Sequence, residues 1–137
     1  MYGLSNAALD TPWPKTLELK QSLAAALRQE TKTHDQEVLR RPLWSALANR
    51  QRAPSDKLPD TGVSQALELA LSSAFVEFPE YGYGTRCSTV LVVSRKEDGV
   101  VAPLLEIDVQ EKTYCRSEID SMPEAPIACT AAVSFFC

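Results

Sequence analysis

Residues Ser88-Thr-Val-Leu-Val-Val-Ser94 give the strongest indication of the fold class of this 137-residue chain. The centre of this stretch, from Thr89 to Val93, is rich in β-branched residues and carries apolar side chains on both alternating faces. β-Branched residues favour strands, and a strand that is apolar on both faces is typical of the interior of a sheet. We therefore expect a central strand over residues 88–94.

The sequence after this stretch predicts a hairpin. Lys96–Gly99 ends in Asp-Gly, a turn signal, and residues 100–109 then alternate as a returning strand, in which Pro103 indicates an edge or a bulge. A further strand within 127–137 is possible. Alternation predicts that Leu105, Ile107 and Val109 face inward, and that Glu106, Asp108 and Gln110 form a solvated face.

Three helices are expected before the strands, over Pro14–Arg28, Pro42–Arg50 and Val63–Val76. Pro42 predicts a helix break, Thr33 with Gln36 forms a capping-box pattern, and Tyr2–Leu4 reads as the end of a strand. Helices followed by antiparallel strands indicate an α+β fold, with a helical layer on one face of the sheet. The apolar stripes are Leu19, Leu23, Ala26 and Leu27; Leu43, Trp44 and Leu47; and Leu67, Ala70, Leu71, Ala74 and Phe75.

Composition bounds the partners and the compartment. The formal net charge of −4 argues against nucleic acid, and no apolar run is long enough for a membrane span. The N-terminus lacks a signal-peptide pattern, which favours reduced thiols and a cytoplasmic location. The four cysteines form no CxxC pair and His34 is the single histidine, so no metal site is expected. The length fits one domain over residues 1–137.

Two dense blocks carry a family resemblance. The first is Tyr-Gly-Leu-Ser-Asn (2–6) followed by Thr-Pro-Trp-Pro-Lys (11–15), and the second is Leu-Pro-Asp-Thr-Gly (58–62) followed by Tyr-Gly-Thr-Arg-Cys-Ser-Thr (83–89). In order and spacing they resemble the NRDE (transport and Golgi organisation protein 2) family over roughly residues 2–108. Residues 110–137 form a divergent tail.

The resemblance implies an N-terminal-nucleophile-hydrolase-like αββα sandwich. Family members begin with Met-Cys and carry an Asn-Arg-Asp-Glu signature, and neither occurs in this sequence. We therefore expect the C-terminal part of such a domain, with the missing N-terminal half, or an equivalent partner, covering the open face of a partial sandwich. Met1 is followed by Tyr2 instead of Cys, so no nucleophile is expected in this chain alone.

The resemblance also implies a site. Asn6 and Arg86 match positions that would stabilise an oxyanion and position a nucleophile in cysteine-type hydrolases of this fold. Structural alternatives remain open: a turn role for Asn6, an ion pair for Arg86, and a packing role for Trp13. The candidate ligand-binding residues are Ser5, Asn6, Trp13, Tyr83, Thr85 and Arg86.

For function, the resemblance implies haem or lipid handling and secretory-pathway organisation, without catalysis by this chain itself. Haem would be a transported ligand and no cofactor is expected, although a small-molecule ligand is possible. Family members are also linked to the Golgi and to mitochondria. The alternative is an amidase of the N-terminal cysteine type, formed when the missing half completes the domain.

Overall fold

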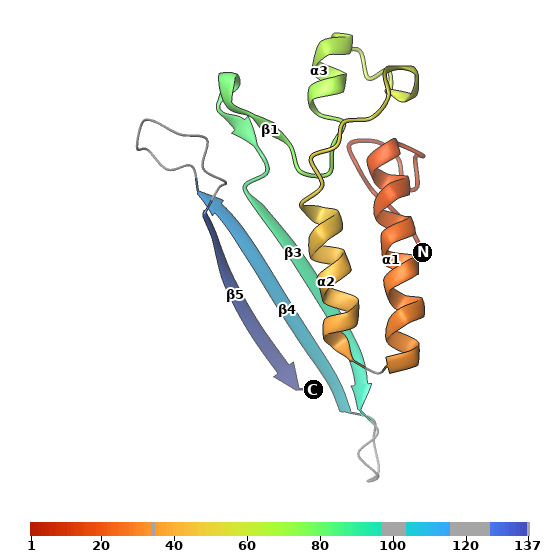
Figure 1. Cartoon of the computed structure of the whole chain (residues 1–137), viewed down its shortest axis with the longest axis vertical. Coiled ribbons are helices and arrows are strands. Elements are labelled where there is room, and N and C mark those ends of the chain that lie inside the picture. Colours follow the sequence, from red (N-terminus) through yellow and green to blue (C-terminus); the bar gives the residue numbers. More distant parts are fainter. Residues whose placement is uncertain (34, 97–103, 116–126, 137) are drawn as a thin grey trace. The chain divides into compact units, whose positions relative to one another are not determined.

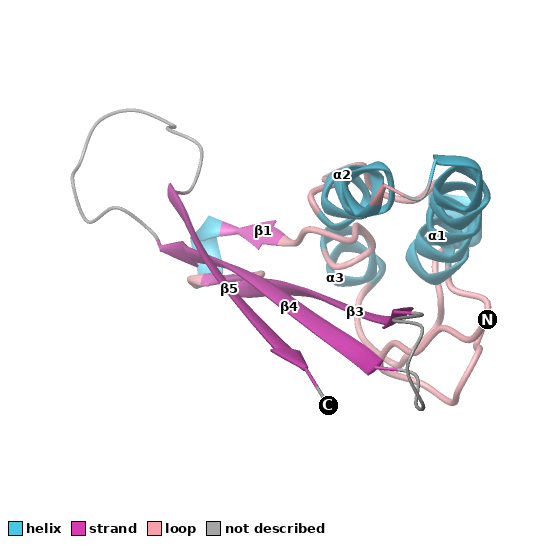
Figure 2. Cartoon of the chain, turned by 90° about the horizontal axis from the view of Figure 1, so that it is seen from below, coloured by secondary structure: helices cyan, strands magenta, loops and turns pink. Residues whose placement is uncertain are grey.

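The computed structural model describes residues 1–33, 35–96, 104–115 and 127–136 (Figure 1). The chain divides into two compact units, Met1–Gly84 and Thr85–Cys137. The first unit holds the helices and a short two-stranded ribbon, and the second holds a three-stranded antiparallel sheet (Figure 2). The expected α+β class is confirmed. The layering of helices on a sheet and the single-domain organisation stay predictions.

Two long helices form an antiparallel pair in the first unit. α1 spans Pro14–Thr33, longer than predicted, and α2 spans Gln36–Leu47. Pro14 suits the first helical position because its missing N–H has no intrahelical partner there. The cap of α2 is Asp35, whose carboxylate accepts the Glu37 N–H at 2.9 Å. This cap replaces the predicted capping box.

The predicted break at Pro42 is wrong, because α2 continues through this residue. A proline inside a helix lacks one hydrogen-bond donor and crowds the carbonyl four residues before it, yet tertiary packing can offset that penalty. α2 buries Leu39 to 6% exposure, ahead of the proline, and its predicted apolar residues Leu43 and Trp44 are half-buried after it. One apolar face therefore spans the proline.

The third helix is much shorter than predicted. After the 3₁₀ turn Ser55–Lys57, α3 covers only Gln65–Ala70. Ser72 donates its hydroxyl to the Leu69 carbonyl at 2.8 Å and also accepts the Ala53 N–H at 2.9 Å. Such serine hydrogen bonds compete with the backbone bonds of a helix. The helix therefore ends at Ala70, although the periodic apolar pattern of the sequence continues beyond it.

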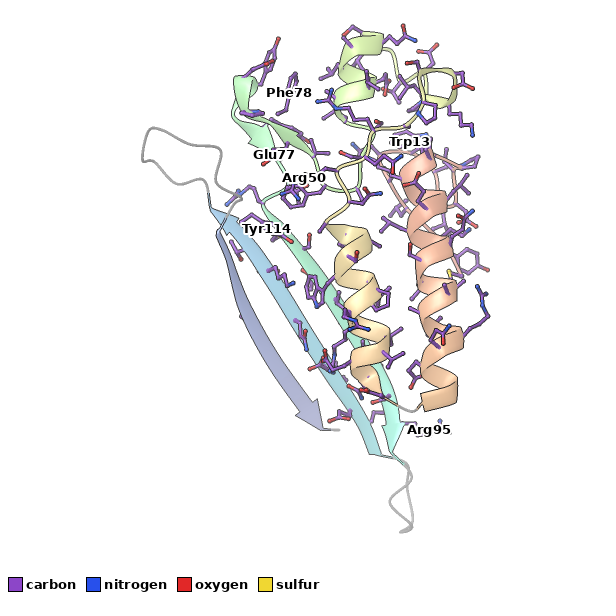
Figure 3. All side chains as sticks on the ribbon, viewed as in Figure 1. Trp13, Arg50, Glu77, Phe78, Arg95 and Tyr114 are labelled. Carbon is purple, nitrogen blue, oxygen red and sulfur yellow. The ribbon has the colours of Figure 1, made fainter. Side chains whose placement is uncertain are left out.

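The segment after α3 is tied to the loop that follows α2. The Phe75 N–H donates to the Asn49 carbonyl at 2.8 Å, and the Phe75 side chain is only 3% exposed. A small ribbon follows, with β1 at Glu77–Phe78 and β2 at Tyr83–Gly84 joined by the 3₁₀ turn Pro79–Tyr81. Figure 3 labels Phe78 on this ribbon.

In the second unit, β3 (Cys87–Lys96), β4 (Leu104–Cys115) and β5 (Ile127–Phe136) are hydrogen-bonded in the order β3-β4-β5. The further strand considered at the C-terminus is therefore present. Within the described sheet, however, β4 is central and β3 lies at an edge, so the predicted central place of residues 88–94 is wrong. A continuous apolar run does not distinguish a central strand from an edge strand whose open face is apolar. The predicted turn and the predicted distortion at Pro103 fall outside the described residues.

At two positions of β4 the exposure is the opposite of the prediction, whereas Glu106, Ile107, Val109 and Gln110 are all half-buried. Asp108 is 7% exposed and accepts a hydrogen bond from Gln110 Nε2 at 3.3 Å, whereas Leu105 is 39% exposed. Alternation fixes which residues share a face but does not say which face is covered. Leu91 and Val93 on β3, paired with Val109 and Ile107 of β4, are also exposed. Among the described residues, this face therefore exposes the apolar side chains of Leu91, Val93 and Leu105.

Two further details of the prediction are wrong. Residues 2–4 form no strand; they belong to a loop closed by Asp10, whose N–H donates to the Gly3 carbonyl at 2.7 Å. Leu27, predicted on the buried stripe of α1, is 40% exposed, while Ala26 beside it is 2% exposed. The buried stripe of α1 is therefore narrower than the apolar pattern indicated.

Candidate functional site

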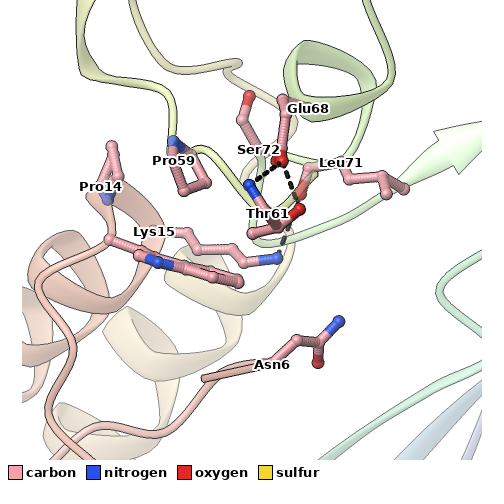
Figure 4. A pocket seen from close by; sticks show the side chains of 9 residues that line it. Asn6, Pro14, Lys15, Pro59, Thr61, Glu68, Leu71 and Ser72 are labelled. Atoms are coloured by element: carbon pink, nitrogen blue, oxygen red, sulfur yellow. Dashed lines mark hydrogen bonds between the residues drawn. The ribbon is translucent and has the colours of Figure 1, made fainter. Parts of the chain in front are cut away.

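A small hollow opens where the first turn of α1 meets the loop before α3 and the end of α3 (Figure 4). All its lining residues belong to the first unit, and its volume is about 90 Å³. Sites for drug-sized ligands usually measure about 300–1,000 Å³, so this one suits a small chemical group. The lining residues are Asn6, Trp13, Pro14, Lys15, Pro59, Thr61, Glu68, Leu71 and Ser72.

Lys15 places a half-buried ammonium in this hollow. Its Nζ donates a hydrogen bond to the Leu71 carbonyl oxygen at 3.1 Å and lies 5.7 Å from the centroid of the Trp13 ring. Burial lowers the pKa of Lys15, and the negative charge of Glu68 acts in the opposite direction. The position of Lys15 follows from the local sequence. Proline is favoured at the first position of a helix, so α1 begins at Pro14 and Lys15 lies in its first turn.

Glu68 supplies the opposite charge. It lies on α3, is 7% exposed, and its Oε1 accepts the Thr61 N–H at 2.9 Å together with the Thr61 hydroxyl. Both bonds are drawn in Figure 4. A buried carboxylate requires such donors, because water no longer solvates it. They also fix the loop that carries Thr61 and Pro59 against α3.

The loop that carries Asn6 is held by Asp10. The Asp10 carboxylate accepts the Gly3 N–H at 2.8 Å and pairs with Lys20 Nζ at 2.7 Å, and Asp10 itself adopts a positive φ of 66°. These contacts close residues 3–10 into a compact loop beside α1. Asn6, at a bend of this loop, is exposed at the edge of the hollow.

The structure brings two predicted site residues, Asn6 and Trp13, to one hollow. Ser5 lies in the same loop but does not line it, and Tyr83 is 58% exposed on β2. Thr85 and Arg86 belong to the second unit, where the Arg86 carbonyl accepts the Tyr114 N–H at 2.8 Å. The binding and catalytic roles assigned to these six residues stay predictions.

Sequence reasoning missed the charged residues of the hollow. Lys15 ends the quoted Thr-Pro-Trp-Pro-Lys block, and Thr61 lies in Leu-Pro-Asp-Thr-Gly, so the motifs contained a signal. Lys15 was not singled out, because an isolated charge on a helix is usually solvated. Thr61 was not singled out, because an uncharged loop residue carries no charge signal. Glu68 lay on a predicted helix with no pattern to distinguish it from a surface residue.

Two features are absent from the part of the chain that the structure describes. No described helix is long and apolar enough to cross a membrane. Among the same residues, no cluster of three or more histidine, cysteine, aspartate or glutamate side chains is arranged to hold a metal ion.

Comparison with known proteins adds a family assignment to this geometry. The family model described as Transport and Golgi organisation 2 matches residues 1–106, which include every residue of the hollow. The chain belongs to the Transport and Golgi organisation 2 family. The match confirms the resemblance drawn from the two sequence blocks.

Two curated relatives of the family are similar to the chain. They are the Transport and Golgi organization protein 2 homolog of Homo sapiens and the Transport and Golgi organization 2 homolog of Mus musculus, each 33% identical over 93 residues. The alignments cover 67% of this chain and 33% of each relative, so the chain spans about a third of their length. No solved structure is significantly similar to it.

Proposed function

We propose that this chain is the ligand-handling part of a cytoplasmic protein for transport and Golgi organisation, concerned with haem or lipid and not catalytic by itself. Membership of the Transport and Golgi organisation 2 family carries this proposal. The half-buried Lys15 beside the aromatic wall of Trp13 gives further support, because such a group can bind the polar end of an amphiphile.

The size of the hollow favours a lipid head group over a complete haem. About 90 Å³ admits a compact polar group, while the apolar part of the ligand would have to lie elsewhere. Haem would reach the hollow only through a peripheral group such as a carboxylate. In either case the ligand is bound without being converted.

A binding experiment tests this role. The chain, and a family protein that contains it, are titrated with haem by absorbance and with fluorescent lipids by emission. We expect saturable, reversible binding of at least one ligand, and recovery of that ligand unchanged after denaturation. Binding of neither ligand by either protein would overturn the proposal.

We place the N-terminal half of a family member on the open sheet face of the second unit. Leu91 and Val93 of β3 are 61% and 54% exposed, and Leu105 of β4 adds to the same face. Contiguous exposed apolar side chains are typical of surfaces that a further polypeptide covers. The curated relatives are about three times as long as the aligned region, which leaves ample chain for this purpose.

Leu91→Ser provides the test. It should leave the unfolding free energy of the chain within about 0.5 kcal/mol, because the side chain is already exposed. It should also weaken association with a separately expressed N-terminal half, measured by calorimetry. Leu9→Ser is a matched control, because Leu9 is equally exposed at 61% in the other unit. Equal affinities for the two variants would contradict this placement.

One observation favours the amidase alternative: Asn6, the candidate oxyanion-stabilising residue, lines the hollow. An Asn amide can donate to a developing oxyanion. The test uses a family member that begins with Met-Cys, assayed for amine release from a panel of small amides. Catalysis would be established by two results together. Replacing the N-terminal cysteine with alanine should abolish amine release, and the variant equivalent to Asn6→Ala should release amine at least about 100-fold more slowly. Release of no amine would exclude catalysis for that panel.

A further inference from the structure

The hollow of the first unit contains two opposite charges that do not neutralise each other directly. Lys15 is engaged by the Leu71 carbonyl and Glu68 by Thr61. Within the described ranges of the chain, neither charged group takes part in an ion pair. Both nevertheless line the same small hollow.

Each group keeps unused hydrogen-bonding capacity. An ammonium group has three hydrogen-bond donors. In Lys15, one of the three donates to the Leu71 carbonyl oxygen. Both bonds to the Glu68 carboxylate end on Oε1, so among the described residues Oε2 has no hydrogen-bond donor. Asn6 adds an amide at the edge of the hollow that can both donate and accept.

A ligand with a single charge would satisfy only one of these two groups. An anion would pair with Lys15 but be repelled by Glu68, and a cation would pair with Glu68 but be repelled by Lys15. In either case the free-energy cost of removing water from the other charged group would stay uncompensated. A ligand that carries both charges satisfies both groups. We infer that the hollow binds a small zwitterion, with its anionic group at Lys15 Nζ and its ammonium at the Glu68 carboxylate.

Size and surroundings agree with this ligand class. A volume of about 90 Å³ holds several water molecules or one compact head group. Trp13, Pro14 and Pro59 give the hollow apolar walls, which strengthen charge interactions by excluding water. Burial lowers the pKa of Lys15, so an anion bound beside it would favour the charged form that recognition needs.

This inference concerns the charges of the hollow and does not depend on the proposed transport role. The probe is glycerophosphoethanolamine, added to the 137-residue chain, and binding is followed by amide chemical shifts. Dimethyl phosphate and ethanolamine present the anion and the cation separately. We expect the zwitterion to bind at least about 10-fold more tightly than either half, because a hydrogen bond to a charged group is gained on each side. Equal affinity for one of the halves would overturn the inference.

Two variants and two matched controls locate the binding. Lys15→Met and Glu68→Gln should each weaken binding of the zwitterion about 10-fold or more. Glu68→Gln keeps a side-chain oxygen that can accept the two hydrogen bonds from Thr61, so this variant should retain the loop. It therefore still tests the inference if the Lys15→Met protein fails to fold. Lys57→Met and Glu80→Gln alter exposed charges outside the hollow and should leave the affinity unchanged. Equal weakening by the controls would overturn the assignment.

Vesicles identify the source of the zwitterion. If the chain floats with phosphatidylethanolamine vesicles and the Lys15→Met variant does not, the ligand is a lipid head group. Binding of the soluble compound without flotation would identify a free small zwitterion. Failure of both the soluble compound and the vesicles to bind would overturn the inference, whereas the haem titration reports separately on the transport role.

Discussion

The guanidinium carbon of Arg50 lies 4.1 Å from the ring centroid of Phe75, where the chain leaves α2. The same guanidinium donates from Nε to Glu77 Oε2 at 3.0 Å, and Figure 3 labels both Arg50 and Glu77. One arginine thus joins the loop after α2 to the buried aromatic ring and to β1. The side chains of the ion pair are 47% and 49% exposed, so solvent weakens the pair more than the stacking.

Arg50→Met should therefore destabilise the chain more than Glu77→Gln. Loss of the stacked cation is expected to lower the unfolding free energy by about 0.5–2 kcal/mol. Loss of the exposed ion pair is expected to lower it by less than about 1 kcal/mol. Urea denaturation followed by circular dichroism measures both values. A larger effect of Glu77→Gln would mean that the ion pair dominates.

Pro42→Ala should stabilise the chain, because α2 continues through this position. Alanine restores a backbone donor and removes ring crowding, and proline inside a helix is less favourable than alanine by about 3 kcal/mol. The greater freedom of alanine in the unfolded chain opposes this by about 0.4–1 kcal/mol. We expect a net gain of about 1 kcal/mol or more and a higher Tm. Pro54→Ala, in the loop before the 3₁₀ turn, is the control and should not raise the Tm. A lower Tm for Pro42→Ala would show that the proline is needed where it stands.

The sequence was most informative where local chemistry and tertiary structure agree. Pro14 at the start of α1, the β-branched run of β3 and the α+β order could all be read from it. The end of α3 could not, because the bond between the Ser72 hydroxyl and the Ala53 N–H joins residues 19 positions apart. Helix periodicity carries no information about such a competitor.

The candidate site shows the same limit. Asn6 and Trp13 were found through motif resemblance, but the charges that make the hollow distinctive were not. Lys15 meets Leu71 across 56 residues of sequence, so its partial burial depends on how the chain folds back. On β4, alternation correctly paired residues onto faces, but Asp108 proved buried and Leu105 exposed. Which face is covered depends on tertiary structure.

Acid should selectively weaken the loop closed by Asp10. The hydrogen bond from Lys20, followed by that from the Gly3 N–H, lowers the pKa of Asp10 from its ordinary value of 3.8. A carboxyl whose pKa is depressed in the folded state contributes stability above its unfolded pKa, and this contribution is lost as the pH falls through the folded pKa. Asp10→Asn removes the charge, and asparagine tolerates the positive φ of this position.

The measurement compares the unfolding free energies of the wild type and of Asp10→Asn from neutral pH to below pH 3.8. The wild type should be the more stable at neutral pH, and the difference should vanish in acid. Lys20→Met should reduce the difference at neutral pH, because Lys20 is the main cause of the pKa shift. A difference between wild type and Asp10→Asn that does not depend on pH would mean that the carboxylate acts only as a hydrogen-bond acceptor.

Gly3→Ala should disturb the base of the loop that carries Asn6. A Cβ at Gly3 would collide with the Cγ2 methyl of Thr16, a side chain only 5% exposed on α1. Overpacking of this kind typically lowers the unfolding free energy by about 1–3 kcal/mol. Thr16→Ser removes the colliding methyl, so the double variant should be more stable than Gly3→Ala alone. Thermal denaturation of the wild type, both single variants and the double variant measures this coupling. Additive effects of the two substitutions would show that the loop relieves the contact by moving away from α1.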